Sequence, residues 1–173
     1  MYASEPEASR ESAVAVVDAM SFRRAGLIAV LDPWAASLGL TLLPMDVLDF
    51  QASLSSRMFI LNIGGQLICE PDHIQWLSTV REQKSGVPFV VISDREEPEE
   101  MLRVFDAGAH GFIPTSTRPE LALQALTFIL GGGSFFPPTA LLSFARDAEI
   151  PAKKSDQSFR KASLPPPHSN TLT

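Results

Sequence analysis

Five short apolar runs constrain the fold of this chain more than any other feature of its sequence. Three of them are rich in Val, Ile and Phe and show no alternation with polar residues. That pattern is typical of strands that are buried on both faces of a parallel sheet. The second and fifth runs are weaker signals, and the fifth has only four residues. The sequence therefore predicts five strands, at residues 13–18, 40–44, 58–63, 88–93 and 111–114.

Helical patterns lie between these runs. The first places Phe22, Ala25, Ala29 and Val30 near one face, and Asp32-Pro33 is typical of a helix start that opens a further turn to Leu38. A second, short helix is predicted at residues 47–54. Pro71 begins a third, with Ile74, Leu77 and Val80 on one face, and Pro98 begins a fourth, which turns Leu102 and Phe105 inward and ends at Gly108. The fifth begins with a capping box formed by Thr117 and Glu120, carries an apolar stripe and ends at 131–133; the stripe consists of Leu121, Ala125 and Phe128.

Strands that alternate with helices predict a small doubly wound α/β sheet with helices on both faces. The carboxyl ends of the strands form the ligand crevice in such sheets. Polar residues stand at or directly after the ends of four of the five predicted strands at this edge. These strand-end residues are Asp18 and Ala19, Asn62 to Gly64, Ser93 and Asp94, and Thr115.

Three segments resemble parts of the receiver domains of LuxR/NarL-type response regulators. Residues 17–27 resemble the start of such domains, where an acidic pair precedes a helix with an Arg-x-Gly-Leu signature, here Arg24 to Leu27. Residues 104–116 resemble the Ala-Gly-Ala-x-Gly segment, and residues 119–138 resemble the fifth helix and the start of the linker. The resemblance covers residues 13–145. It implies a flavodoxin-like (CheY-like), doubly wound, five-stranded parallel sheet with the order 2-1-3-4-5.

The resemblance also implies a phosphorylation site, which this chain keeps only in part. A working receiver uses two acids to hold magnesium, an acceptor aspartate, a lysine and a hydroxyl side chain. Here Asp18 keeps the first acid, whereas Ala19 replaces the second. Asn62 stands at the acceptor position, and its neutral amide cannot form an acyl phosphate. Ser93 keeps the hydroxyl and Thr115 replaces the lysine, so these residues form a degenerate phosphorylation pocket.

These departures predict a pseudo-receiver that has no catalytic residues and is not an enzyme. Phe112 occupies the position of the family's switch aromatic, without a phenol oxygen. We expect no metal and no cofactor, because His73, His110, His168 and Cys69 lack the spacing of a zinc site. Asp18, Asn62 and Ser93 could alternatively be strand-end residues that only satisfy backbone groups.

The predicted organisation has four parts. A flexible N-terminus (1–12) precedes the receiver-like domain (13–133) and a helical C-terminal extension (134–146). Residues 147–173 are predicted to be a flexible linker, because four prolines and few aliphatic residues lie between residues 146 and 173. Because the chain ends in Leu172-Thr173, a pair that in this class introduces the DNA-binding helix-turn-helix domain, we expect the protein to continue into such a domain.

Charge and composition limit the partners. The net charge of −6 disfavours direct binding of nucleic acid, so we expect DNA binding only through the missing C-terminal domain. We expect a homodimer formed by the first helix or by residues 121–130, and possible docking of a protein on the fourth helix, fifth strand and fifth helix. One cysteine and the lack of a signal or membrane segment predict a cytoplasmic protein. The alternative is a stand-alone flavodoxin-like ligand-binding domain or signalling adaptor.

Overall fold

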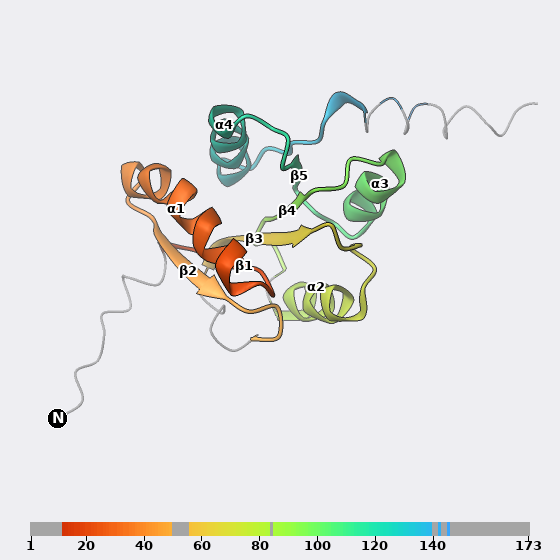
Figure 1. The fold of residues 1–173 in the computed structure, drawn as a ribbon, viewed down its shortest axis with the longest axis horizontal. Helices are drawn as coiled ribbons and strands as arrows, with labels where there is room; N and C mark the ends of the chain where they lie inside the picture. Colours follow the sequence, from red (N-terminus) through yellow and green to blue (C-terminus); the bar gives the residue numbers. More distant parts are fainter. Residues whose placement is uncertain (1–11, 50–55, 84, 140–141, 143–144, 146–173) are drawn as a thin grey trace, which may run out of the picture.

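Five parallel strands form one sheet in the order β2-β1-β3-β4-β5 (Figure 1). The computed structural model describes residues 12–49, 56–83, 85–139, 142 and 145. The predicted strand order and parallel arrangement are confirmed. The strands are β1 (Ala13–Val17), β2 (Thr41–Met45), β3 (Ser56–Gly64), β4 (Phe89–Ser93) and β5 (Gly111–Pro114).

Helices cover both faces of the sheet. The first, α1 (Ser21–Ser37), packs with α4 (Pro119–Leu130) on one face, and α2 (Pro71–Gln83) packs with α3 (Pro98–Asp106) on the other. The side chains of β1 alternate between these two layers, as a pleated strand requires: Val14 and Val16 join the first, whereas Ala15 and Val17 join the second. The central strands are therefore buried on both sides, which explains their continuous apolar runs.

The two layers differ in composition. The α2–α3 layer is aromatic: the Trp76 ring meets Phe59 edge-on at 5.6 Å and Phe89 at 6.2 Å between centroids. The α1–α4 layer is largely aliphatic, and it contains Trp34, whose indole Nε1 donates to Thr127 Oγ1 at 3.0 Å. That bond joins the two helices of this layer.

Two predicted helix boundaries differ from the structure. Residues 21–37 form one continuous helix with Pro33 inside it, and no new helix begins at Asp32-Pro33. Proline removes one helical hydrogen bond, but Leu31, Trp34 and Ala35 are buried on either side of it and hold the helix against the sheet. The predicted helix at 47–54 is wrong at its start, because Val47 and Leu48 form a turn; residues 50–54 lie outside the described part.

Four predicted helix faces are also corrected. Phe22 and Val30 of α1 point outward, and so do Leu121 and Phe128 of α4. In α3 the side chains of Met101 and Val104 are buried, whereas Phe105 is half exposed. In α2 the side chain of Trp76 is buried, and that of Ile74, which was predicted to face inward, is exposed. Arg118 caps α4 with no side-chain hydrogen bond, so the capping box of Thr117 and Glu120 does not form. Because these helices carry apolar residues on more than one face, periodicity alone could not identify the inward one.

The chain after α4 returns to the edge of the sheet. Phe135 forms a parallel bridge with Gly111: Phe112 N donates to Phe135 O at 2.9 Å, and Phe135 N donates to His110 O at 3.0 Å. The Phe136 ring packs edge-on against Phe105 with centroids 5.4 Å apart. The extension thereby covers the outer edge of β5 at its start. Within the predicted helix at 134–146 the structure describes four helical residues, namely Pro138, Thr139, Leu142 and Ala145.

Candidate functional site

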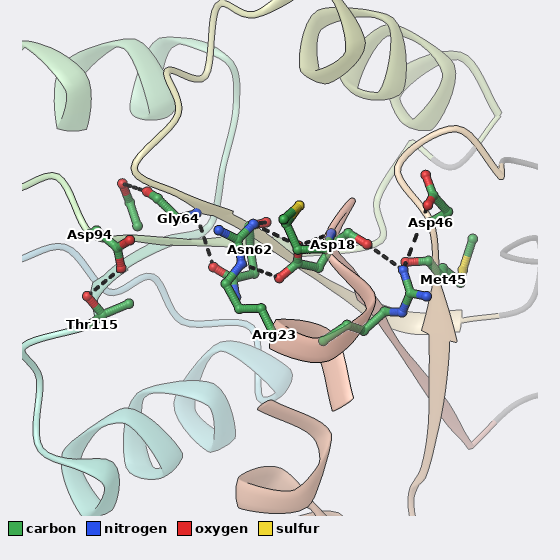
Figure 2. Close-up of polar contacts among 11 residues, drawn as sticks. Asp18, Arg23, Met45, Asp46, Asn62, Gly64, Asp94 and Thr115 are labelled. Atoms are coloured by element: carbon green, nitrogen blue, oxygen red, sulfur yellow. Dashed lines mark hydrogen bonds and ion pairs between the residues drawn. The ribbon is translucent and has the colours of Figure 1, made fainter. Parts of the chain in front are cut away.

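Most of the predicted site residues meet at the carboxyl ends of the strands (Figure 2). Asp18 follows β1, Asn62 lies near the end of β3, Ser93 ends β4 and Thr115 follows β5. The relative exposure of Asp18 and Ser93 is 0%, and that of Asn62 is 5%. We call these four residues, together with Arg23, Gly64 and Asp94, the carboxyl-edge cluster.

Arg23 is the centre of this cluster. Its Nε and Nη2 donate to the two carboxylate oxygens of Asp18, each at 2.7 Å, and Nη2 also lies 3.4 Å from the backbone oxygen of Asn62 (Figure 2). A bidentate pair of this kind is among the strongest polar contacts in proteins. The buried carboxylate of Asp18 is thus neutralised by a cation from the same chain.

Local sequence spacing explains why Arg23 reaches Asp18. Asp18 directly follows β1 and also accepts a hydrogen bond from Met20 N at 2.8 Å, which fixes the start of α1. Arg23 lies five positions further on, in the first turn of that helix. The adjacent Arg24 donates from Nη1 to the backbone oxygens of Asp18 and Met45, so the two arginines connect the ends of β1, β2 and β3.

Gly64 provides the space for the guanidinium. Its φ of 55° is in the left-handed region that favours glycine. A Cβ atom at this position would lie 1.9 Å from Arg23 Nη1. Any side chain at position 64 would therefore displace Arg23.

Backbone groups engage the two other buried polar residues. Asn62 Oδ1 accepts from Gly64 N at 3.2 Å. Ser93 Oγ donates to Gly64 O at 3.2 Å and accepts from Arg95 N at 3.0 Å. Both side chains therefore shape the loops after β3 and β4, as the purely structural interpretation of these residues predicts.

The outer part of the cluster is exposed, and its hydrogen bonds join hydroxyl groups to carboxylates. Thr115 Oγ1 donates to Asp94 Oδ1 at 2.8 Å. The neighbouring Ser116 hydroxyl donates to Glu96 Oε1 at 2.5 Å. These bonds join the loop after β4 to the loop after β5, at positions where water can replace either partner.

The charge of Arg23 is secured by its surroundings. The hydrogen bond to Asp18 raises the pKa of the Arg23 guanidinium above its ordinary value; burial opposes this shift, and the charges of Asp18 and Asp94 add to it. The guanidinium therefore stays protonated at every pH at which the protein would be studied.

Two predicted positions contribute no polar side chain to the cluster. Ala19 is exposed and offers no polar atom from its side chain. Phe112 is fully buried and packs in the aromatic layer between the sheet and the helices α2 and α3. Neither side chain can therefore bind a metal ion or a phosphate through a polar atom, and that of Phe112 is also enclosed in the core.

The two histidines that the structure describes are held in separate places, and His168 lies outside the described residues. His73 Nδ1 lies 2.7 Å from Leu67 O, whereas His110 Nδ1 accepts from Phe89 N at 3.4 Å. Within the described residues no three His, Cys, Asp or Glu side chains converge as a metal site would require. None of the described helices is long and apolar enough to cross a membrane.

A cavity of about 230 Å³ lies away from the carboxyl-edge cluster, beside the C-terminal ends of α2 and α3. Val80, Phe89 and Ala107 give it apolar walls, and Arg81, Asp106 and His110 contribute polar groups. It shares no residue with the cluster.

Arg23, the central residue of the site, is not among the residues that the sequence predicts there. It lies within a segment that resembles the receiver family, five residues after Asp18. A basic residue in the first turn of a helix that follows an aspartate at a strand end is the signal that could have indicated this ion pair. The roles of Gly64 and Asp94 depend on contacts between different strands, which no local pattern reveals.

Comparison with known proteins places this architecture among response regulators. No protein-family model and no curated protein sequence matches the chain. Among solved structures, a LuxR family DNA-binding response regulator from Silicibacter pomeroyi has 26% sequence identity and a TM-score of 0.59, and the match covers 74% of this chain and 98% of that one. A LuxR-family two-component response regulator from Aurantimonas sp. SI85-9A1 has 17% identity and a TM-score of 0.62, covering 79% and 96%. The isolated REC domain of RcsB from Salmonella enterica serovar Typhimurium has 14% identity and a TM-score of 0.60, covering 76% and 96%.

Proposed function

We propose that this domain is a phosphorylation-independent regulatory and dimerisation module, a pseudo-receiver, of a LuxR-type DNA-binding transcriptional regulator. The receiver-like fold and its LuxR-family structural neighbours support the regulatory class. The main support for the proposed loss of phosphorylation is the side chain at the acceptor position. Asn62 is a neutral amide, and its Oδ1 is engaged by Gly64 N. An amide cannot provide the carboxylate nucleophile that acyl phosphate formation needs.

The surroundings of Asn62 support the same proposal. The position of the phosphate-binding lysine holds Thr115, which donates to Asp94 and carries no positive charge. The buried acid Asp18 is already paired with Arg23. The domain therefore communicates through shape and contact, without chemistry and without a cofactor.

The test of phosphorylation independence is incubation of the full chain with magnesium and acetyl phosphate, followed by intact mass measurement. We expect no gain of a phosphoryl group. A gain that disappears in Asp18→Ala or Asn62→Ala would overturn the proposal. An active receiver domain treated in parallel verifies the phosphodonor.

Dimerisation would use the outer faces of α1 and α4. Phe22 is 93% exposed and Val30 is 53% exposed on α1, while Leu121 and Phe128 are 42% and 60% exposed on α4. The bond between Trp34 and Thr127 holds the two helices side by side. A second copy of the chain is the proposed occupant, since two solved neighbours are RcsB molecules bound to DNA and one of them is described as two dimers.

Sedimentation equilibrium of the wild-type chain and the variant Phe22→Glu tests this surface. We expect a dimer for the wild type and at least a tenfold weaker association for the variant, because a carboxylate would be buried without a partner. Ile74→Glu is the control, since Ile74 is another exposed apolar residue, at 48%, but lies on α2, across the sheet. A wild-type monomer at high micromolar concentration would contradict the dimer.

DNA binding belongs to a separate domain in this proposal. The chain has 20 acidic and 14 basic residues, which is a poor balance for contacting phosphates. The match to promoter-bound RcsB covers 80% of this chain but 68% of RcsB. We also place the regulator in the cytoplasm and propose the α3–β5–α4 face as a possible protein-docking surface.

The alternative, a stand-alone ligand-binding domain or adaptor, places a ligand at the carboxyl edge. There, the Arg23 guanidinium already takes up the oxygen atoms of Asp18. A ligand-induced rise in melting temperature that persists in Arg23→Ala would favour that alternative.

A further inference from the structure

The guanidinium of Arg23 contacts three oxygen atoms at the ends of two strands. Both carboxylate oxygens of Asp18 lie 2.7 Å from its nitrogens, and the backbone oxygen of Asn62 lies at 3.4 Å. The negative charge of Asp94 acts on the same group from the end of β4. Carboxylate and carbonyl oxygens are the ligands that hard divalent cations select. The arrangement is that of a cation site whose occupant is a side chain.

We propose that the carboxyl edge of this domain contains a latent divalent-cation site that the protein fills with its own arginine, so that Arg23 excludes Mg²⁺ and Mn²⁺. The inference rests on the proposed function and deepens it, because the Arg23 guanidinium would keep Asp18 paired and this edge free of metal at any magnesium concentration. It concerns cation binding and does not depend on whether Asn62 can be phosphorylated.

Burial is the first support for this proposal. Asp18 is fully buried, and a buried carboxylate needs a cation or strong donors close to it. Arg23 supplies both through two parallel hydrogen bonds. If the guanidinium is removed, the same requirement remains and a metal ion in solution can meet it.

The space around Arg23 is the second support. Gly64 adopts φ 55° and has no Cβ, and Arg23 Nη1 takes up the volume that a side chain would occupy. Truncation of Arg23 would therefore leave a gap next to Asp18 and the Asn62 carbonyl. A hydrated magnesium ion needs few protein ligands and keeps several waters, so a gap with one carboxylate and one carbonyl can hold it.

Charge is the third support and explains the mutual exclusion. With Arg23 present, its positive charge balances the charge of Asp18, and a divalent cation would be repelled at close range. Without Arg23, Asp18 and Asp94 leave two negative charges at the ends of β1 and β4. The truncated site should attract divalent cations, whereas the natural one should not.

The experiment uses the full chain as wild type and as Arg23→Ala. Melting temperatures are measured against MgCl₂, with KCl at matched ionic strength as the salt control. At a magnesium concentration ten times Kd, we expect a rise of about 4 °C for Arg23→Ala and no specific rise for the wild type. In NMR spectra, Mn²⁺ should broaden the amide signals of Asp18 and Gly64 in the variant only.

Three further variants complete the test. Arg95→Ala removes an arginine from the exposed β4–α3 loop and should leave the chain insensitive to magnesium, whereas Asp18→Asn combined with Arg23→Ala should abolish the new site. If Arg23→Ala does not fold, Arg23→Gln keeps a donor for Asp18 and is tested instead. A folded Arg23 variant whose melting temperature and amide signals do not respond to the metals would overturn the proposal. So would a wild-type chain that binds them equally well.

Discussion

The carboxyl-edge cluster has two halves that are built in different ways. The inner half joins β1 to β3 through the buried pair of Asp18 and Arg23, with Gly64 against the guanidinium. The outer half joins the loops after β4 and β5 through the exposed bond from Thr115 to Asp94. Both halves contain a carboxylate and a donor, but only the inner carboxylate is shielded from water.

This difference determines what each half can tolerate. Loss of Arg23 from the inner half leaves the Asp18 carboxylate without its counterion in a largely buried site, which costs several kcal/mol. Loss of a partner in the outer half lets water take its place at little cost. The inner half therefore stabilises the fold by holding β1 and β3 together, and we call it the structural lock. The outer half is the part that could vary without loss of the fold.

The largest expected effect is that of Arg23→Ala. It removes the counterion of the Asp18 carboxylate, so we expect a loss of about 3 kcal/mol in the free energy of unfolding, measured in urea without divalent cations. Arg95→Ala removes an arginine whose ion pair with Glu97 is exposed, and it should cost about 0.5 kcal/mol or less. Equal losses in the two variants would show that burial of the ion pair does not set the cost of removing an arginine from this edge.

Gly64→Ala should be the next most destabilising change, at about 2 kcal/mol, because it combines left-handed strain with a collision against Arg23. Gly39→Ala is the matched control: φ there is 67°, and an added Cβ would meet no atom within 4 Å beyond its chain neighbours. Its cost should be about 1 kcal/mol, from strain alone. In an Arg23→Ala background the two glycine variants should become equal, and a difference that persists would show that Arg23 is not the group in collision.

The fold was largely predictable because it depends on local patterns. Continuous apolar runs such as 58–63 and 88–93 identify central strands of a parallel sheet, since burial on both faces removes polar alternation. Pro71 and Pro98 mark helix starts, and Gly108, with φ 89°, follows the last turn of α3. Each of these signals is contained within a few residues.

Helix faces and the site's central contact could not be predicted in the same way. Phe22 and Phe128 are apolar but face outward, because Trp34 and Leu126 occupy the inward positions of the same helices. The position of Arg23 over Gly64 depends on the packing of α1 against the end of β3. Contacts of this kind are set by tertiary structure, which a periodic pattern in one segment does not contain.

Ser93→Ala tests the boundary between the two halves. Its hydroxyl is buried and bonds to Gly64 O and Arg95 N, so its loss leaves two backbone groups with one partner fewer. We expect a cost of about 1 kcal/mol in urea unfolding. Ser37→Ala is the control, because Ser37 bonds to Trp34 O on an exposed part of α1 and should cost less. A cost as large as that of Arg23→Ala would extend the lock to β4.

Thr115→Val should have the smallest effect. Valine keeps the shape of threonine and removes only the donor to Asp94, which is exposed and can bond to water. We expect a change within about 0.5 kcal/mol in urea unfolding. Thr115→Lys should be equally mild, since the ammonium can pair with Asp94 at the surface, and by mass measurement it should not restore transfer from acetyl phosphate. The reason is that a lysine restores charge in the outer half, whereas the inner half still holds an amide at position 62 and a guanidinium against Asp18.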